Sequence, residues 1–300
     1  MKLDSHPLVS IVIPCYNHEN FVQECIQSVI DQTYQNIELI IIDDGSKDGS
    51  VEKIQEMIFA CQARFVRFEF RHRPNKGLSA TLNEALEWCQ GSYYSAIASD
   101  DMLLQSKIAI QVEYLENPNN VKCAGVFGNV IYIDNNSDYL RESRLLFKRN
   151  KFEDIFLQNY SILAPTQLLR LDLVRKVGYY DEDVKIEDYY MWLKLTFSNK
   201  FHLDSLEDCF VKYRAHETNS SNNSQLMHEE RLKVLRNYKE LDNYEQAISL
   251  SYLMYANEIL KKNRNTSLKI FRRGFLINKK IIFKRSAVKY LMKLAYGLVV

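Results

Sequence analysis

Several features that define other classes of protein are absent from this sequence of 300 residues. No segment approaches the roughly 20 apolar residues that a membrane-spanning helix requires. The N-terminus has neither the basic region nor the apolar core of a secretory signal. The six cysteines form no Cys-x-x-Cys pair, so we expect reduced and mostly buried thiols. These absences predict a cytoplasmic protein that at most lies on the inner face of the cell membrane.

Acidic residues are absent from the last part of the chain. Residues 261–300 contain twelve Lys or Arg and no Asp or Glu, whereas residues 1–260 carry 27 basic and 38 acidic residues. The overall charge of +1 therefore hides a negative body and a positive tail. Such a split predicts that the tail meets an anionic surface. Because no aromatic stacking motif or nucleic-acid-binding fold accompanies the bases, we expect no nucleic-acid partner.

Strand and helix patterns alternate through the first hundred residues. β-Branched or apolar runs predict strands at 8–13, 37–42, 65–70 and 93–98. Helical spacing and turn signals predict helices at 21–32, 51–60 and 80–89. This alternation indicates the α/β class, with a mainly parallel sheet and right-handed crossovers. In such sheets, ligands bind beyond the carboxyl ends of the strands.

Polar side chains gather at these predicted strand ends. They are Tyr16, Asp43, Asp44, Asn75, Lys76, Asp100 and Asp101. An aromatic ring can stack on a base, a carboxylate can accept from a base N–H, and an ammonium can meet phosphate. Adjacent carboxylates repel each other unless a cation such as Mn²⁺ or Mg²⁺ neutralises them. Each residue alone has a plain alternative, such as a turn, a solvated side chain or a helix cap, but their convergence favours a diphosphate site.

Four stretches resemble the family-2 inverting glycosyltransferases of the GT-A fold. They are residues 9–17 (VSIVIPCYN), 38–46 (ELIIIDDGS), 75–77 (NKG) with Asn83, and 98–101 (ASDD). Later motifs extend the resemblance to about residue 216. The resemblance implies a Rossmann-like, mainly parallel sheet flanked by helices. It also implies a nucleotide-sugar donor, usually linked to UDP, that is held with Mn²⁺ or Mg²⁺.

The resemblance also assigns residues to the nucleotide site. Pro14 and Tyr16 would line the base pocket, and Asp44 would read the base. Asp43 would support the ribose or the loop. The next turn would complete the site with Asn75, Lys76 and Gly77.

The metal position is implied by the acidic motif of the family. Asp100 and Asp101 would occupy the metal and ribose positions, although the first acidic position of the motif is Ala98 here. Which of the two carboxylates touches the metal therefore stays open. Residues 213–216 resemble a Tyr-Arg-x-His element, in which His216 would be a ligand of the metal or the diphosphate. A structural histidine is the alternative, with Arg214 contacting phosphate instead.

A pair of acids opens the helix that is predicted after residue 186. Inverting sugar transfer needs one carboxylate to take the proton of the acceptor hydroxyl. The family pattern assigns this base to Asp188, with Glu187 as its neighbour. The alternative is structural, because two acids in a first helical turn favour the helix dipole.

The polar stretch 217–225 predicts a boundary between two domains. We expect a catalytic domain at 1–220, with a nucleotide-sugar half (1–105) and an acceptor half (106–220). A helical and basic extension would follow at 221–300. A helical wheel places Ile281, Val288, Leu291, Met292 and Ala295 on one face, which suggests a helix on anionic lipid. The alternative is a packed helical pair with a solvated basic face.

With the family resemblance, these features predict a metal-dependent inverting glycosyltransferase of the hexosyltransferase class. It would move a sugar from a nucleotide-sugar to a hydroxyl of a saccharide acceptor, which the resemblance suggests is lipid-linked. Such enzymes serve bacterial surface polysaccharides such as O-antigen. One alternative is a non-catalytic glycan- or nucleotide-binding subunit on the same fold. Another is a sugar-nucleotide nucleotidyltransferase, although no glycine-rich loop follows Ile13, which also argues against an NAD-dependent oxidoreductase.

Overall fold

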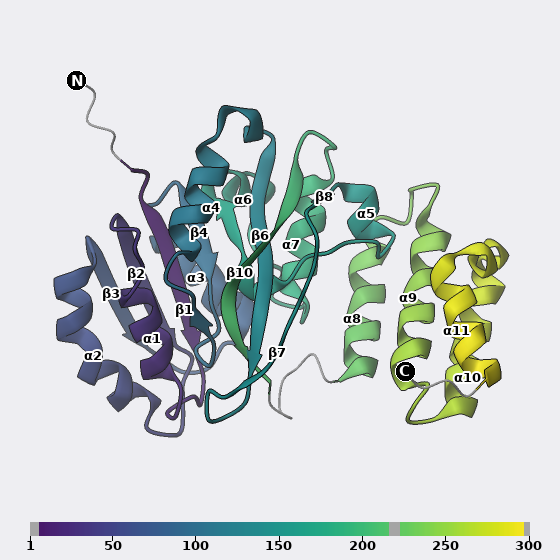
Figure 1. Cartoon of the computed structure of the whole chain (residues 1–300), viewed down its shortest axis with the longest axis horizontal. Coiled ribbons are helices and arrows are strands. Elements are labelled where there is room, and N and C mark those ends of the chain that lie inside the picture. Colours follow the sequence, from purple (N-terminus) through teal and green to yellow (C-terminus); the bar gives the residue numbers. More distant parts are fainter. Residues whose placement is uncertain (1–5, 216–222, 297–300) are drawn as a thin grey trace. The chain divides into compact units, whose positions relative to one another are not determined.

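The structure is a computed structural model that describes residues 6–215 and 223–296 (Figure 1). The chain divides into two compact units. The described part of the first unit comprises residues 6–152, 160–183 and 187–215. The second unit comprises residues 223–296 together with two short pieces, 153–159 and 184–186. Each unit is described separately below.

The first half of the first unit alternates strand and helix, as the sequence predicts. Its elements are β1 (Val9–Cys15), α1 (Val22–Ile30), β2 (Ile37–Asp43), α2 (Ser50–Arg64), β3 (Arg67–His72), α3 (Leu78–Trp88) and β4 (Tyr93–Ala96). These four strands are parallel and lie in the order β3-β2-β1-β4, with β3 at one end of the sheet. The loops after β1, β2 and β4 therefore meet at one edge.

The second half extends the same sheet with mixed strand directions. Its elements are β5 (Met102–Leu103), α4 (Lys107–Glu116), η1 (Pro118–Asn120), β6 (Cys123–Ile133), β7 (Tyr139–Glu142), β8 (Lys148–Asn150), η2 (Ala164–Thr166), β9 (Leu168–Arg170), α6 (Leu171–Val177), α7 (Glu187–Thr196) and β10 (His202–Arg214). The short helix α5 (Phe152–Phe156) follows β8 along the chain, and all of it after Phe152 belongs to the second unit. The ten-stranded sheet continues from β4 through β9, β6, β10 and β5. β9 runs antiparallel to both neighbours, whereas β6 and β10 are parallel. The expected α/β class, with a largely parallel sheet and flanking helices, is confirmed.

Strand β1 extends to Cys15, beyond its predicted end at residue 13, so Pro14 lies inside the strand. The carbonyl of Val12 accepts from Ile97 on the β4 side, and that of Cys15 accepts from Asp44 on the β2 side. Backbone groups alternate along a strand, so the missing N–H of Pro14 faces the β4 side. Pairing with β4 has already ended at Val12. The proline therefore removes no ladder hydrogen bond.

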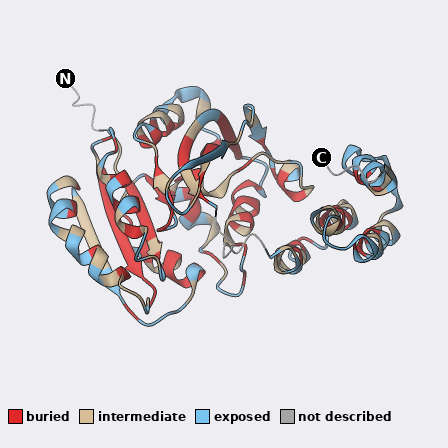
Figure 2. Ribbon diagram, turned by 60° about the horizontal axis from the view of Figure 1, so that its bottom comes forward, coloured by how far each residue is buried: buried red, intermediate tan, exposed pale blue. Residues whose placement is uncertain are grey.

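The core of the first unit follows the central strands, which are buried along their length (Figure 2). Strands of a parallel sheet are covered on both faces, which explains the continuous apolar runs of β1 and β2. Charged side chains also lie inside, and Lys107 is one of them. The fully buried Nζ of Lys107 donates to the hydroxyl of Ser95 and the carbonyl of Gln167, at 2.9 and 3.0 Å. Burial lowers the pKa of Lys107 to about 7.

The second unit is helical. It contains α8 (Ser224–Arg236), α9 (Tyr244–Ile259), α10 (Arg264–Ile277), η4 (Lys279–Phe283) and α11 (Arg285–Tyr296). Its core includes Leu253, Phe271 and Tyr290. Ile281 is also part of this core. Because it lies in η4, before α11 begins, it does not share a helix face with Val288 as the sequence predicted. None of the helices in the described parts of the chain is both long and apolar enough to cross a membrane.

Candidate active site

The loop after β1 is fastened to the loop after β2. The backbone N–H of Asn17 donates to the Ser46 hydroxyl at 2.8 Å, and its side chain accepts from the N–H of Lys47 at 2.7 Å. Asn17 adopts a left-handed backbone (φ 56°), which asparagine tolerates better than most residues. Just before it, Pro14 is half-buried and the ring of Tyr16 is 47% exposed. Tyr16 therefore presents an aromatic face to solvent at the sheet edge.

Asp43 is fully buried at the end of β2 and holds its own loop. Its carboxylate accepts from the N–H groups of Gly45 and Ser46, at 3.1 and 2.9 Å. It also accepts from the Ser46 hydroxyl and lies 2.8 Å from Nδ1 of His72. Of the two expected roles, support of the loop is the one that these contacts describe.

Asp44 ties the end of β2 to the turn before α3. Its carboxylate pairs with Arg73 and accepts from the N–H groups of Lys76 and Gly77, at 2.8 and 2.9 Å. Arg73 is also buried and donates to Glu84 at 2.8 Å. Sequence reasoning missed Arg73, because nothing in its spacing marks it as the partner of a residue 29 positions earlier.

The turn that joins β3 and α3 brings the predicted residues Asn75, Lys76 and Gly77 beside the β2 loop. Asn75 is exposed, and the ammonium of Lys76 lies 3.9 Å from a Glu84 oxygen. Gly77 immediately precedes α3 and has φ 90°, a conformation that favours glycine. Gly45 approaches this turn closely, since a Cβ on it would lie 2.7 Å from the Asn75 nitrogen.

Asp100 and Asp101 follow β4 in a turn whose carboxylates differ in exposure. Asp100 is 8% exposed, whereas Asp101 is 1% exposed. Asp101 accepts from the backbone N–H of Arg214 at 2.8 Å. Burial and the charge of Asp100 raise the pKa of Asp101 well above its usual range. Asp100 thus has the more accessible carboxylate of the pair.

The guanidinium of Arg214 clamps this turn from β10. It is fully buried and donates to the carbonyls of Asp100 and Asp134, at 2.9 and 2.8 Å. It also pairs with Glu24 at 2.7 Å and donates to Ser137 at 3.1 Å. Because these acceptors occupy a buried guanidinium, the geometry does not support the alternative in which Arg214 contacts phosphate. His216, the other predicted residue of this element, lies outside the described residues.

His18 lies on the other side of the same turn. Its Nδ1 is 2.8 Å from the Ser99 hydroxyl and 3.9 Å from an Asp100 oxygen. Its backbone N–H donates to Ser50 at 2.9 Å, which links the β1 loop to α2. Sequence reasoning did not single out His18, although its place between Tyr16 and the first helix was the available signal. The β1 and β4 loops thus meet at Asp100.

Glu187 and Asp188 are the first two residues of α7 and are half-buried. Asp188 accepts from the N–H of Tyr189 at 2.6 Å. Burial raises the pKa of Tyr180, and the negative charges of Glu187 and Asp188 raise it further. Asn83 of α3 holds Tyr180 by both backbone groups, at 2.9 and 3.0 Å. The segment before α7 is therefore fixed to α3.

A second group of possible metal ligands lies elsewhere in the sheet. Cys123, His202 and Asp204 are buried and place their ligand atoms within 4.8 Å of one another. Asp204 is already paired with Arg149 at 3.1 Å and accepts from Tyr114 at 2.9 Å. Burial raises the pKa of the Cys123 thiol to about 12. Because metals bind thiolate, we assign no metal to this group.

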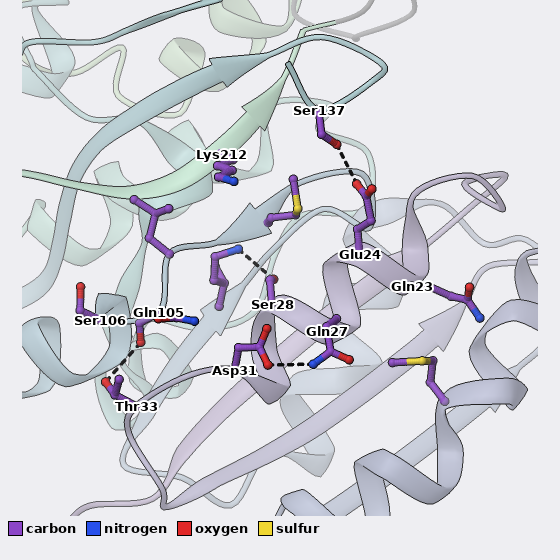
Figure 3. Close-up of a pocket in the computed structure, with 14 residues that line it drawn as sticks. Gln23, Glu24, Gln27, Ser28, Asp31, Thr33, Gln105, Ser106, Ser137 and Lys212 are labelled. Carbon is purple, nitrogen blue, oxygen red and sulfur yellow. Dashed lines mark hydrogen bonds between the residues drawn. The ribbon is translucent and has the colours of Figure 1, made fainter. Parts of the chain in front are cut away.

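A pocket of about 900 Å³ lies beside α1 and β5 (Figure 3). Its labelled side chains include Glu24, Gln27, Asp31 and Lys212. Glu24 and Ser137 also contact Arg214, so the pocket touches the clamp of the acidic turn. None of the described residues that line it is a predicted nucleotide, metal or catalytic residue. The pocket is therefore distinct from the candidate site.

Comparison with known proteins places this site in a family context. An uncharacterized glycosyltransferase of Rickettsia typhi is 30% identical over 228 residues, which are 74% of this chain and 69% of that protein. The Escherichia coli protein WfgD, named UDP-Glc:alpha-D-GlcNAc-diphosphoundecaprenol beta-1,3-glucosyltransferase, is 28% identical over 72% of this chain and 80% of its own length. Other curated relatives are longer, and this chain spans 31% of one from Rickettsia bellii and 35% of one from Rickettsia conorii.

Solved structures share the fold at low sequence identity. S. aureus TarS 1–349 in complex with UDP-GlcNAc matches with a TM-score of 0.63 and 15% identity, over 96% of this chain and 80% of that one. The mannosyltransferase PcManGT from Pyrobaculum calidifontis, in complex with GDP-Man and Mn²⁺, matches with a TM-score of 0.57 and 11% identity, over 99% and 89% of the two chains. The fold is therefore that of GT-A glycosyltransferases. A model of glycosyl transferase family 2 matches residues 10–176, and the chain accordingly belongs to glycosyl transferase family 2.

Proposed function

We propose that this chain is a metal-dependent inverting glycosyltransferase that uses a nucleotide-sugar, with UDP as the nucleotide. The observation that carries the proposal is the convergence of the loops after β1, β2 and β4 at one sheet edge. Asn17 joins the first two loops, and His18 joins the first to the acidic turn at Asp100. Ligands of open α/β sheets bind at this edge.

The nucleotide would lie between the exposed ring of Tyr16 and the turn at 75–77. In this proposal Pro14 and Tyr16 line the base pocket, and Asp44 lies at its floor. The backbone N–H of Lys76 donates to Asp44, which holds Lys76 beside the proposed base pocket. Its exposed ammonium would meet a phosphate of the nucleotide. The UDP-GlcNAc complex of a structural neighbour favours UDP, whereas the GDP-Man complex of another makes GDP the competitor to test.

A divalent cation fits the acidic turn. Two adjacent carboxylates supply hard oxygen ligands, which suit Mn²⁺ or Mg²⁺. Asp100 would be the ligand, because it is the more accessible of the two. Asp101 would hold the turn through the Arg214 backbone, and His216 stays a proposed further ligand. When bound, such an ion offsets negative charge on a departing diphosphate.

Asp188 is the proposed general base. Its carboxylate would accept the proton of the acceptor hydroxyl while that oxygen forms a bond to the anomeric carbon. The bond from this carbon to the diphosphate oxygen breaks at the same time, on the opposite face, so the configuration inverts. Glu187, the preceding residue of α7, would share the acceptor side of the site. Both carboxylates are half-buried, which leaves them accessible to a substrate.

The acceptor is proposed to be a lipid-linked saccharide at a membrane surface, as in the assembly of surface polysaccharides such as O-antigen. The name of the relative WfgD, which includes alpha-D-GlcNAc-diphosphoundecaprenol, supports this choice. The proposed catalytic domain covers residues 1–220, and the basic extension 221–300 would bring it to the inner face of the cell membrane. No nucleic-acid partner is proposed.

The test begins with calorimetric titration of UDP and GDP into the protein, with Mn²⁺ and again with EDTA. We expect UDP to bind only with the metal, and equal binding in EDTA would contradict the role of Asp100. Asp188→Asn should keep UDP binding and lower sugar transfer by roughly 10²–10⁴-fold.

Asp172→Asn is the matched control for the base. Asp172 is an exposed acid in the first turn of α6, so it also favours a helix dipole but lies outside the proposed site. Transfer should be unchanged in this variant. Equal losses in both variants would leave Asp188 with a helix-stabilising role, and full activity of Asp188→Asn would remove it as the base.

A further inference from the structure

Helix α11 of the second unit has three distinct faces. Ala287 and Tyr290 are fully buried in the core of this unit, and Leu294 packs against them. Beside this face, Val288 and Met292 are 45% and 52% exposed. Helical spacing of three to four residues also places the exposed Leu291 on the same stripe. An apolar stripe of α11 is therefore left uncovered within the described structure.

A basic stripe runs along the next face of α11. It consists of Arg285, Lys289 and Lys293, which follow one another at intervals of four residues and are all exposed. Residues 261–300 contain no Asp or Glu, so no acid of this segment offsets them. Apolar and basic stripes side by side are the arrangement of a helix that lies in a membrane interface.

Exposed apolar side chains are concentrated in this part of the chain. Single exposed apolar residues are ordinary, but six of the large ones lie between positions 276 and 292. They are Leu276, Ile277, Phe283, Val288, Leu291 and Met292. Phe283, at the end of η4, is 81% exposed. The three on α11 share one face of that helix, and an exposed apolar stripe of this kind marks an interaction surface.

We propose that the two stripes of α11, here called the tail face, lie on the surface of an anionic lipid bilayer. The apolar side chains enter the boundary between headgroups and acyl chains, and the bases meet lipid phosphate. The charge of the tail selects this occupant, because an anionic bilayer matches both stripes. A nucleic acid would match only the basic one. The inference deepens the proposed membrane location by naming the contact, but it does not require sugar transfer.

Sedimentation with vesicles tests the apolar stripe. The full chain should bind vesicles that contain phosphatidylglycerol and bind phosphatidylcholine alone weakly. Leu291→Ser combined with Met292→Ser should lower the partition coefficient roughly tenfold. Phe59→Ser is the matched control, since Phe59 is 83% exposed on α2 of the first unit and its loss should leave binding unchanged.

A charge-reversal pair tests the basic stripe. Lys289→Glu with Lys293→Glu should weaken binding to anionic vesicles by more than about fivefold for each base. Arg236→Glu with Lys239→Glu changes the net charge of the second unit equally, at exposed positions outside the tail face. This control should retain most of the binding. High salt should weaken binding of the wild-type chain, because it screens the charges.

The outcomes separate this inference from the proposed function. Transfer to a soluble saccharide acceptor, measured on the same variants, should stay unchanged while vesicle binding falls. Equal vesicle binding by the tail-face variants and their controls would overturn the inference. It would also be overturned if the wild-type chain bound no vesicles but formed a dimer that Leu291→Ser with Met292→Ser dissolves, or bound duplex DNA in preference to anionic vesicles.

Discussion

The residues that shape the candidate site are largely buried charges that hold loops. Asp43 ends β2 and Asp44 follows it, yet Asp43 closes its own loop and Asp44 fixes the turn before α3. Arg214 does the same for the acidic turn. A buried charge that loses a partner is costly, so these residues keep the loops in one geometry before any ligand arrives. Positioning of this kind reduces the ordering cost of binding.

Arg214→Lys tests whether the contacts of the Arg214 guanidinium position the turn at Asp100. A single ammonium cannot reach the four acceptors of the guanidinium. We expect the free energy of unfolding to fall by roughly 2–4 kcal/mol. Metal-dependent UDP binding, measured by calorimetry on the folded variant, should weaken at least tenfold because the Asp100 turn is no longer fixed.

Arg149→Lys is the control for this prediction. Arg149 pairs with the buried Asp204 in the same unit but contacts no residue of the acidic turn in the described structure. It should lower stability without changing UDP binding. If Arg214→Lys binds UDP with Mn²⁺ as tightly as the wild type does, Arg214 has only a structural role.

Sequence reasoning at this scale found side chains that belong to compact motifs. Asp100, Asp101 and Glu187 were placed at a strand end and a helix start, where the structure has them. The partners were harder to find. Asn83 was recognised as part of a motif, but its bonds to Tyr180 cross 97 positions and leave no spacing signal. Arg73 escaped notice for the same reason.

At the scale of elements, the pairing of α8 with α9 depends on a neutral histidine. The ring of His228 is buried and stacks on Tyr255, with ring centroids 4.8 Å apart. Its Nδ1 lies 3.0 Å from the hydroxyl of Ser251. Burial, followed by the charge of Arg231, lowers the pKa of His228 to about 4. The folded helix pair therefore excludes the charged ring.

Acid should destabilise the second unit because of this histidine. In the unfolded chain His228 binds a proton below about pH 6.5, whereas in the folded chain it does so only below about pH 4. Stability therefore falls as the pH drops through this window, by roughly 2–3 kcal/mol at full effect. Urea unfolding followed by far-UV circular dichroism at pH 7 and 4.5 measures the change. His228→Phe should reduce the pH dependence, whereas His6→Phe, at an exposed position, should not.

Elements with strong local patterns were predicted, and those defined by distant pairing were not. The runs that became β1 and β2 were plain in the sequence, as was α3. Residues 138–151 had no regular pattern, yet they form β7 and β8 by pairing with β6 and β10. Such short strands exist because a neighbouring strand supplies their partners, which a local pattern cannot reveal.

At the scale of the whole molecule, the two units differ in a way that can be measured. Both tryptophans of the chain, Trp88 and Trp192, belong to the first unit. Tryptophan fluorescence therefore reports unfolding of that unit alone, whereas circular dichroism reports both. The proposed nucleotide site also lies entirely in the first unit.

UDP with Mn²⁺ should stabilise the fluorescence transition selectively. At a free concentration one hundred times its Kd, a ligand that binds only the folded state adds about 2.7 kcal/mol to the free energy of unfolding. We expect the tryptophan transition to shift to higher temperature by a few degrees, and the remaining helical signal to shift less. UDP with EDTA is the control, and an equal shift without metal would contradict the proposed cation.

The terminal position of β3 has a consequence for solubility. An unpaired strand edge can recruit the edge of another molecule and seed aggregation. Arg67, Glu69 and Arg71 alternate along β3 and therefore line one side of it, where they pair with Glu38, with each other and with Glu84. A second copy adding to this edge would have to displace or desolvate these charges. Many copies can therefore gather on one surface without joining through this strand edge.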